Sequence, residues 1–449
     1  MANNTYNLIV IGAGPAGYSA AIRGAQLGAL VLLVEKEAVG GTCLNWGCMP
    51  TKFLWESLHL QKKMRRAADY GITADVKGQD FTALQQKKGK TVELLTKGLS
   101  ALLKSYSIET AEGAASFAGP DEIIIKKKNG ETQSVKGKKI IIATGSRSSN
   151  LKDLAIDHNK ILDSTDLLNI KEPPKSLLII GGGAIGVELA TIYSGLGCEV
   201  TVIEKEPQLL PAADAELAAE VKKILERQGV KVITGSGDFG ELVKTADKVL
   251  LSAGRKPNVD GLALEKAGVK YSEKGIEIDE FCRTSDENIY AAGDVTGKSF
   301  LAYVSQAEGA AAAENALGGK TTVNRDAVPW AVFSDPPVAG VGARENDLPA
   351  EKISIGRFQL AASGRAAIES ERKGWAKIIC EKSTGKLLGG CMAGPGAEEL
   401  MPVLALAVRN KLTAKDLSRE IFFHPSISEA LHCACEDALG KCVDLPAKK

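Results

Sequence analysis

Short apolar runs alternate along the chain with segments whose apolar residues recur at helical spacing. The first run covers residues 6–11, a helical pattern extends from Tyr18 to Leu27, and a second apolar run, LVLLVEK, ends at Lys36. Both runs are rich in branched aliphatic residues, which is typical of strands buried on both faces of a parallel sheet. The pattern predicts a strand–helix–strand unit at the start of the chain.

The turn inside this unit reads GAGPAG and places glycines at Gly12, Gly14 and Gly17. Such glycines let the backbone turn tightly and approach a pyrophosphate at the N-terminus of the helix. Glu35, at the end of the second strand, can accept hydrogen bonds from a ribose diol. Because the strand, the helix and the acid are all present, the motif predicts a dinucleotide site.

The same unit recurs at residues 176–206, with glycines at Gly181, Gly183 and Gly186 and an acid at Glu204. A duplicated module predicts two dinucleotides. A carboxylate at position 204 suits a free 2′-hydroxyl and repels a 2′-phosphate, which favours NAD over NADP. Lys205 next to it weakens this preference slightly.

Further elements follow from the same patterning. A long helix is predicted from Phe81 to Tyr106, and Asn129-Gly130 between two strand-like runs predicts a hairpin. Apolar runs then return the chain to the sheets, ending before Thr144-Gly145 in the first half and before Gly254 in the second. Another buried strand runs into Gly293-Asp294.

Beyond Asp326 the pattern changes to antiparallel strands with turns, and helices begin near Glu398 and Ser426. The prediction is an α/β protein with two Rossmann-like dinucleotide-binding domains and a C-terminal α+β domain. The expected boundaries are 1–148 for the first domain, 149–282 for the second, 283–325 for a continuation of the first, and 326–449 for the last.

Composition argues against several classes of protein. The 449 residues carry a net charge of +1, so no bulk attraction to nucleic acid or to an anionic membrane is implied. No apolar run reaches the roughly 18 residues of a membrane span. The N-terminus has no basic region before its short apolar run, so we expect a cytoplasmic protein.

Nine cysteines are scattered through the chain, and two stand close together in GGTCLNWGCMPTK, as Cys43 and Cys48. In a regular helix their Cα atoms would lie roughly 8–9 Å apart, beyond the reach of a disulfide, so a bridge needs a turn that Gly47 can distort. A stabilising bridge would close only a short loop, and further metal ligands at a sensible spacing are missing. We therefore favour a redox pair and expect no metal.

These motifs together resemble the class I pyridine nucleotide-disulfide oxidoreductases: the first glycine motif, C-x₄-C followed by P-x-K, ATG, the second glycine motif, GD, and a late HPSISEA. Within them the chain is most similar to the dihydrolipoamide dehydrogenase branch, through AASGRA, GPGAEEL and HPSISEA. The resemblance spans nearly the whole length and implies FAD and NAD as cofactors, with the last domain mediating dimerisation.

The resemblance also implies binding residues. Lys52 would lie by the flavin and pair with Glu188. The FAD set comprises Gly12, Gly14, Gly17, Glu35, Lys36, Gly41, Thr42, Lys52, the backbone near Ala115, Thr144, Gly145, Asp294 and Ala302. The NAD set comprises Gly181, Gly183, Gly186, Glu188, Glu204 and Gly254.

In this family's chemistry, Cys43 would meet the substrate and Cys48 would lie beside the flavin. His424, oriented by Glu429, would be the acid–base and would come from the other subunit of a homodimer. The implied function is oxidation of protein-bound dihydrolipoamide with NAD⁺, as the E3 component of a 2-oxoacid dehydrogenase or glycine-cleavage complex. The implied partner is therefore a lipoyl-bearing protein. Alternatives are reduction of another small disulfide or of a thioredoxin-like substrate, and a mainly docking role in such a complex.

Three features depart from the family's pattern. Residues 233–254 are too short for the β-meander usual in the second module. Trp46 and Tyr303 flank the expected active site where the family often has a smaller residue and a histidine. The tail carries Cys433, Cys435 and Cys442; residues i and i+2 of a helix face apart, so a 433–435 disulfide is not expected.

Overall fold

The opening strand–helix–strand unit is confirmed in the computed structural model, which describes residues 5–446. It comprises β1 (Thr5–Ile11), α1 (Pro15–Gln26) and β2 (Val31–Glu35). β1 and β2 pair in parallel. The helix begins three residues before the predicted Tyr18, because Pro15 occupies the first turn, where the missing N–H is tolerated and φ is already helical.

The first sheet has the strand order β3-β2-β1-β6-β5-β4, and β16 also pairs with β6. The long β6 pairs in parallel with β1 along its second half and antiparallel with β5 along its first. The turn at Asn129-Gly130 joins β5 to β6 as predicted, with Gly130 at φ +87°. The added strands are β3 (Glu109–Glu112), β4 (Ala114–Gly119), β5 (Glu122–Lys126), β6 (Thr132–Ile142) and β16 (Ile289–Ala291).

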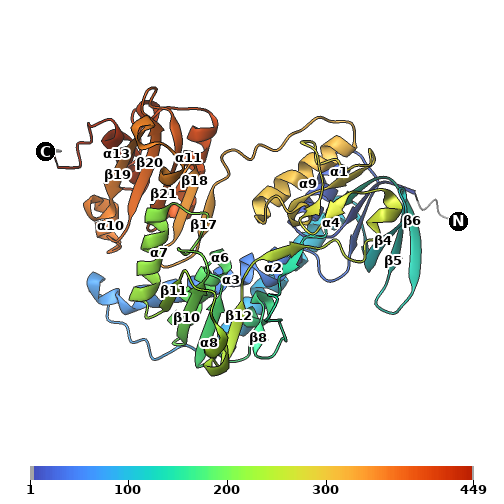
Figure 1. The fold of residues 1–449 in the computed structure, drawn as a ribbon, viewed down its shortest axis with the longest axis horizontal. Helices are drawn as coiled ribbons and strands as arrows, with labels where there is room; N and C mark the ends of the chain where they lie inside the picture. The colour runs from blue at the N-terminus through green and yellow to red at the C-terminus, as the bar shows by residue number, and fades with distance from the viewer. Residues whose placement is uncertain (1–4, 447–449) are drawn as a thin grey trace.

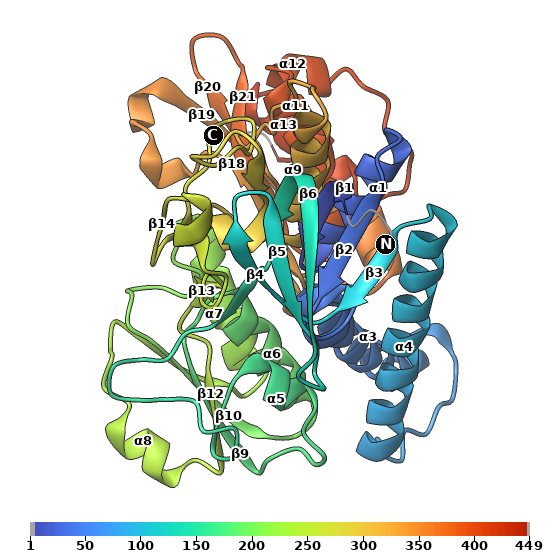
Figure 2. The same ribbon diagram turned by 90° about the vertical axis from the view of Figure 1, so that its right-hand side faces the viewer.

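Helices α1 and α9 (Ala302–Ala316) pack closely against one another in this domain (Figure 1). A Cβ on Gly309 would lie 2.0 Å from the carbonyl oxygen of Ala16, so the approach requires glycine. The predicted long helix is α4 (Phe81–Ser105), which runs beside β3 at the edge of the domain (Figure 2). Two further helices, α2 (Gly41–Trp46) and α3 (Cys48–Arg65), precede it.

The second module forms a parallel sheet in the order β11-β10-β9-β12-β8. One short helix, α8, joins β11 to β12, where the first module has its β4–β5 excursion. The two chain crossings between the modules, β7 and β13, pair with each other antiparallel. The strands are β7 (Ser146–Ser148), β8 (Ile161–Leu162), β9 (Ser176–Ile180), β10 (Glu199–Glu204), β11 (Lys231–Thr234), β12 (Lys248–Leu251) and β13 (Arg255–Pro257); the helices are α5 (Ser164–Leu168), α6 (Ala184–Gly195), α7 (Ala215–Arg227) and α8 (Gly240–Thr245).

The C-terminal domain is an antiparallel sheet in the order β17-β18-β21-β20-β19 with helices against it, as predicted for an α+β unit. Strand β19 is an addition to the prediction, because its apolar residues are interrupted by Gly356 and Arg357. The elements are β17 (Trp330–Val332), β18 (Val338–Gly342), β19 (Ile353–Gln359), β20 (Trp375–Glu381), β21 (Leu387–Ala393), α10 (Gly364–Ile368), α11 (Ala397–Arg409), α12 (Ala414–Leu417) and α13 (Glu429–Ala438).

A buried lysine joins this domain to the second module. The Lys377 side chain is 0% exposed, and its Nζ lies 2.7 Å from Asp214, 3.0 Å from Glu216 and 2.9 Å from Glu345. Although burial opposes it, these carboxylates raise the pKa of Lys377 above its ordinary value. A buried charge needs such partners, so the network fixes how β20 meets the N-terminus of α7. No helix among residues 5–446 is long and apolar enough to cross a membrane.

Candidate active site

The first glycine turn has the geometry of a dinucleotide cradle. Gly12 adopts φ +99°, and a Cβ on Gly17 would lie 1.7 Å from the Gly12 carbonyl oxygen. The Glu35 carboxylate accepts hydrogen bonds from the backbone N–H of Ala13 (2.6 Å) and of Glu37 (2.8 Å). The turn therefore holds its acid in a fixed position at the end of β2.

The second turn repeats this arrangement. Gly181 adopts φ +110°, and a Cβ on Gly186 would lie 2.0 Å from the Gly181 carbonyl oxygen. Glu204 accepts hydrogen bonds from Gly182 N–H (2.7 Å) and Glu206 N–H (2.9 Å) and is buried. The residues present in both modules thus fit a bound dinucleotide, as the sequence predicts.

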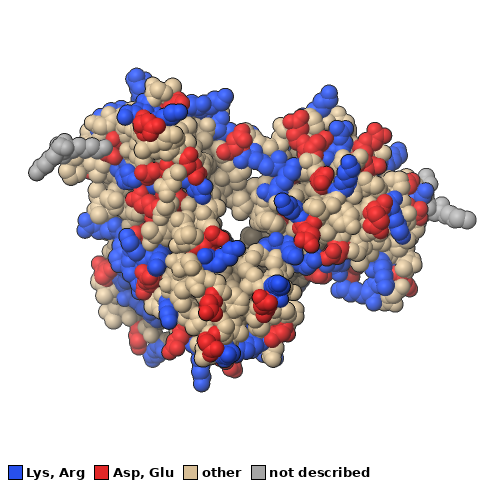
Figure 3. All heavy atoms as spheres, in the orientation of Figure 1, with Lys and Arg blue, Asp and Glu red and all other residues tan. Residues whose placement is uncertain are grey.

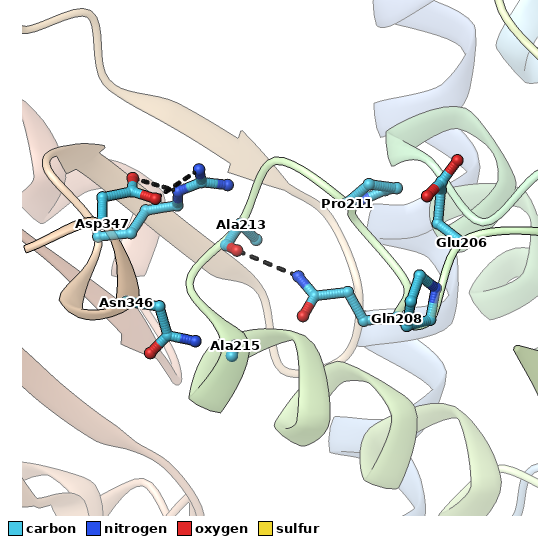
Figure 4. A pocket seen from close by; sticks show the side chains of 9 residues that line it. Glu206, Gln208, Pro211, Ala213, Ala215, Asn346 and Asp347 are labelled. Carbon is cyan, nitrogen blue, oxygen red and sulfur yellow. Dashed lines mark hydrogen bonds and ion pairs between the residues drawn. The ribbon is translucent and has the colours of Figure 1, made fainter. Parts of the chain in front are cut away.

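A cavity adjoins the acid end of each module. One, of about 300 Å³, is lined by Glu35 and by Thr110, Ala111 and Glu112 of β3; Ala115 is not among the lining residues. The other, of about 240 Å³, lies between the loop after Glu204 and the segment Arg344–Asp347 of the C-terminal domain. Figure 4 shows Glu206 and Gln208 on one side of it and Asn346 and Asp347 on the other.

The cysteine pair lies where α2 breaks into α3. Helix α2 ends at Trp46, Gly47 adopts φ −139° and ψ −102°, and α3 begins at Cys48. This is the distorted turn that a bridge between residues 43 and 48 requires. Both residues are free thiols here and hydrogen-bond to one another. The hydrogen bond from Cys43 and the charge of Lys52 lower the pKa of Cys48 to about 7, while the same contact and burial raise that of Cys43.

The predicted pairing of Lys52 with Glu188 is present, across 136 residues of sequence. Lys52 Nζ lies 2.9 Å from the Glu188 carboxylate and 4.5 Å from the centre of the Phe333 ring. Phe333 N–H also donates to Glu188, at 3.1 Å. Residues from all three domains therefore meet one turn of α3 after Cys48.

A polar group joins the crossings between the modules to the predicted Asp294. Ser146 Oγ donates to Asp294 at 2.6 Å and accepts from Arg255 Nε at 2.7 Å. Thr144 Oγ1 donates to the carbonyl oxygen of Asn258 at 2.7 Å. Sequence reasoning missed Ser146 and Arg255, because they lie 109 positions apart and only the pairing of β7 with β13 brings them together.

Two tyrosines also lie near the cysteines. Burial and the neighbouring Cys48 raise the pKa of Tyr303 to about 12. Burial and both cysteines raise the pKa of Tyr18, whose hydroxyl accepts from Gln306. Tyr303 directly follows the predicted Ala302 and donates to the carbonyl oxygen of Pro329 at 2.5 Å. Tyr18 gave no sequence signal beyond its place in the first helix.

His424 and Glu429 form a pair at the start of α13, with His424 Nδ1 2.8 Å from Glu429 Oε1. Burial acts against it, but hydrogen bonds from Ser426 N–H and His424 lower the pKa of Glu429. The His424 side chain is 76% exposed. The pair lies in the C-terminal domain, with Glu429 at the first residue of α13, whereas the cysteines lie on α2 and α3. Figure 1 draws α13 well apart from these two helices.

The remaining predicted residues lie around the two glycine turns and at the crossings between the modules. Lys36 forms an exposed ion pair with Glu37, and Thr42 is exposed on α2. Gly41 lies against Gly14, where an added Cβ would come within 2.7 Å. Gly145 and Gly254 adopt φ +71° and +117° at the two crossings. Within residues 5–446 no cluster of three or more His, Cys, Asp or Glu side chains could hold a metal.

Comparison with known proteins identifies the family of the chain. Residues 6–309 match the family described as pyridine nucleotide-disulphide oxidoreductase, and residues 328–435 match that family's dimerisation domain. The chain is 39% identical to dihydrolipoyl dehydrogenase of Geobacillus stearothermophilus, over 98% of this chain and 97% of the relative. It is 41% identical to the enzyme of the same name from Thermus scotoductus, over 96% and 97%.

Solved structures are similar over the same length. The HOCl-induced flavoprotein disulfide reductase RclA of Escherichia coli, as its Cu(II) complex, superposes with a TM-score of 0.87 at 28% identity, covering 96% of this chain and 99% of RclA. LpdA of Mycobacterium tuberculosis gives a TM-score of 0.87 at 26% identity, with the same coverage. The chain therefore belongs to the pyridine nucleotide-disulphide oxidoreductase family.

Proposed function

We propose that this chain oxidises protein-bound dihydrolipoamide to lipoamide with NAD⁺, as the E3 component of a 2-oxoacid dehydrogenase or glycine-cleavage complex. The observation that carries the proposal is the Cys43–Cys48 dithiol beside the Lys52–Glu188 pair. It occurs in a chain whose relatives named dihydrolipoyl dehydrogenase align over nearly its whole length. The enzyme would act in the cytoplasm.

FAD and NAD are the cofactors of this family, and both modules fit them. The first module would hold FAD through its glycine turn and Glu35, and the second would hold NAD through its glycine turn and Glu204. Once bound, the flavin supplies the path by which two electrons pass from the dithiol to NAD⁺. The buried Glu204 disfavours the 2′-phosphate of NADP by charge repulsion.

The thiol chemistry begins from the oxidised pair, with a bond between Cys43 and Cys48. A substrate thiolate attacks the Cys43 sulfur and displaces Cys48 as a thiolate. Cys48 is suited to leave because the charge of Lys52 stabilises its thiolate. The second substrate thiol then attacks the mixed disulfide, which releases lipoamide and leaves both enzyme sulfurs reduced. Two electrons and two protons leave the substrate in total.

His424 would remove the proton from the attacking thiol. Its Nδ1 faces Glu429, which fixes the tautomer and leaves Nε2 to act as the base. Because the ring is 76% exposed and lies in a different domain from the cysteines, we propose that it serves the cysteine pair of the partner subunit in a homodimer.

Exposed apolar side chains next to His424 support this dimer. Ile421 is 98% exposed and Phe423, adjacent to His424 in the chain, is 81% exposed. Leu406 of α11, elsewhere in the same domain, is 63% exposed. Apolar side chains exposed this fully in one domain are typical of a surface that another protein covers. A second copy of the chain is the proposed occupant, since these residues lie within the match to the dimerisation domain.

The test compares two histidine variants. His424→Ala should lower kcat with dihydrolipoamide by at least about 10³-fold and leave NADH-to-dye electron transfer within about twofold. His158→Ala is the matched control, because His158 also forms an exposed pair with a carboxylate, 2.9 Å from Asp166, but lies in the second module. Normal lipoamide turnover in His424→Ala would remove this residue from the mechanism.

Steady-state kinetics with dihydrolipoamide, glutathione disulfide and a thioredoxin, each with both nicotinamide cofactors, tests the substrate. We expect turnover of dihydrolipoamide with NAD⁺ to exceed every other combination. The similarity to RclA, a flavoprotein disulfide reductase, makes reduction of another disulfide the second candidate. Activity confined to NADPH and glutathione disulfide would overturn the lipoamide assignment.

A further inference from the structure

A second pair of cysteines meets at the C-terminus, through a reversal of the chain after α13. The helix ends at Ala438, and Gly440 adopts φ +68°, a left-handed conformation that ends helices readily in glycine. Gly440 N–H donates to the Asp437 carbonyl oxygen and Lys441 N–H to that of Glu436, both at 3.0 Å. The following residues therefore run back along the helix.

This reversal brings residues 442–444 back against α13, where Cys442 packs on the buried cluster that includes Cys433. Cys433 also donates to Asp444 Oδ2 at 3.6 Å. Cys433 is 2% exposed, whereas Cys442 is partly exposed and so accessible to a small reagent. Cys435 is fully buried on the same helix and has Cys380 as its neighbouring thiol.

We propose that Cys433 and Cys442 are an oxidisable thiol pair that hydroperoxides convert to a disulfide, independently of the Cys43–Cys48 pair. The inference goes beyond the proposed function and does not depend on it. It rests on the packing of Cys442 beside α13, which carries Cys433, on the access to Cys442, and on the carboxylate of Asp444 beside Cys433. The sequence alone directed attention to residues 433 and 435, which cannot meet on a helix.

The chemistry balances with hydrogen peroxide as the oxidant. The Cys442 thiolate attacks one peroxide oxygen, forming a sulfenic acid and releasing hydroxide. Cys433 then attacks the Cys442 sulfur, its proton passing through Asp444, and the sulfenic oxygen leaves as water. Two thiols and one peroxide thus give one disulfide and two waters. Burial raises the pKa of both thiols, but a backbone hydrogen bond with Asp444 opposes the rise at Cys442. Cys442 is also the more accessible of the two, which favours it as the first to react.

Tryptic mapping of the full-length holoenzyme after treatment with hydrogen peroxide and alkylation of remaining thiols tests the proposal. Cleavage at Lys441 separates the peptide 420–441, with Cys433 and Cys435, from the peptide 442–448, with Cys442. A disulfide from Cys442 therefore joins two peptides, whereas one between Cys43 and Cys48 stays inside the peptide 37–52. We expect the joined species to appear with peroxide and to disappear with dithiothreitol.

Two variants show which cysteine of α13 is joined to Cys442. Cys435→Ser should keep the joined species at its wild-type yield, and Cys433→Ser should lose it at least about tenfold, with Cys442 oxidised further to the sulfinic acid. Persistence of the link in Cys433→Ser, or its loss in Cys435→Ser, would overturn the pairing. Sulfinic acid at Cys442 in the wild type without a joined peptide would overturn the proposal altogether. Circular dichroism of each variant shows that it is folded.

Discussion

The two dinucleotide modules share one turn geometry but differ in the segment that succeeds the acid. In each, an acid at the end of the second strand accepts a hydrogen bond from the turn and another from the residue two positions later. After β2 the first module inserts α2 and α3 with the cysteine pair, whereas after β10 the second proceeds to α7 without a cysteine. Both modules therefore carry the residues that fit a dinucleotide, and only the first carries the cysteine pair between its second strand and its later elements.

The pKa values of the cysteines differ between the two modules in the same way. Cys198, which directly precedes β10 of the second module, is buried, and burial raises its pKa to about 11. Cys48 of the first module is half-buried, and its pKa falls to about 7 because the Cys43 thiol and the Lys52 ammonium face it. Reactivity therefore depends on charged and hydrogen-bonding neighbours rather than on burial alone.

The largest expected effect separates these two cysteines. Cys48→Ser should lower dihydrolipoamide turnover by at least about 10³-fold, since serine cannot form the disulfide that accepts the electrons. Cys198→Ser should stay within about threefold of the wild type. The measurement is steady-state kinetics on protein with bound flavin. Equal losses of turnover in the two variants would contradict the assignment of the thiol chemistry to Cys48 alone.

Glycine substitutions should separate the two cofactors. Gly17→Ala places a Cβ 1.7 Å from a carbonyl oxygen and should yield colourless protein, because the first cradle cannot close. Gly186→Ala, with a contact of 2.0 Å, should keep the flavin absorbance but weaken NADH binding by about a hundredfold.

The control for both is Gly89→Ala, in the interior of α4, where an added Cβ meets nothing within 4 Å. It should raise the free energy of unfolding by about 0.5–1 kcal/mol and leave both cofactors bound. Loss of flavin from Gly186→Ala, or its retention by Gly17→Ala, would contradict the assignment of one cofactor to each module.

A smaller effect is expected at the acid of the second module. Glu204→Gln should raise KM for NAD⁺ about tenfold and leave kcat nearly unchanged, because one charged acceptor for the ribose is lost. Glu199→Gln, on the exposed start of the same strand, should change neither constant. An unchanged KM in Glu204→Gln would place the ribose elsewhere.

The smallest effect concerns pH. In the reduced holoenzyme, iodoacetamide should alkylate Cys48 at a rate that rises through pH 7 and falls about tenfold for each unit below it, since only the thiolate reacts. Cys43→Ala removes the hydrogen-bond donor and should shift this midpoint upward. Cys198 should react only after unfolding. A midpoint unchanged by Cys43→Ala would assign the lowered pKa to Lys52 instead.

Local sequence was enough to predict much of this fold. Strand–turn–helix periodicity and the glycine spacing predicted both modules, and the five-residue spacing of the cysteines with Gly47 predicted the break between α2 and α3. The pairing of Lys52 with Glu188 came from family resemblance, because nothing local connects residues 136 positions apart.

The remainder depended on tertiary context. Lys377 lies in a strand where a lysine would be expected to face solvent, and only the approach of Asp214 and Glu345 explains its burial. Ser146 and Arg255 meet through strand pairing between the modules. The contact of Cys433 with Cys442 required the reversal at Gly440, which helical periodicity does not describe.

Positive and negative side chains are interspersed over all three domains on the face drawn in Figure 3, as the net charge of +1 suggests. No single-signed patch on that face therefore marks one domain off from the others. The boundary between the first two modules is marked instead by the two places where the chain passes from one to the other.

The short ribbon of β7 and β13 is where the chain passes between the first two modules. Ser148 lies opposite Arg255 in this ribbon, so the chain leaves the first module and returns to it at the same place. Residues 149–254 therefore form a segment with adjoining ends, a geometry that tolerates insertion of whole domains. The predicted boundary at 282 lies later in the chain, but Leu262, Leu264 and Ile276 pack in the core of the first module. A different nucleotide-binding unit with the same end-to-end spacing would leave both crossings at their present length, but it would also have to supply the partners of Lys52 and Lys377 that Glu188 and Asp214 provide here.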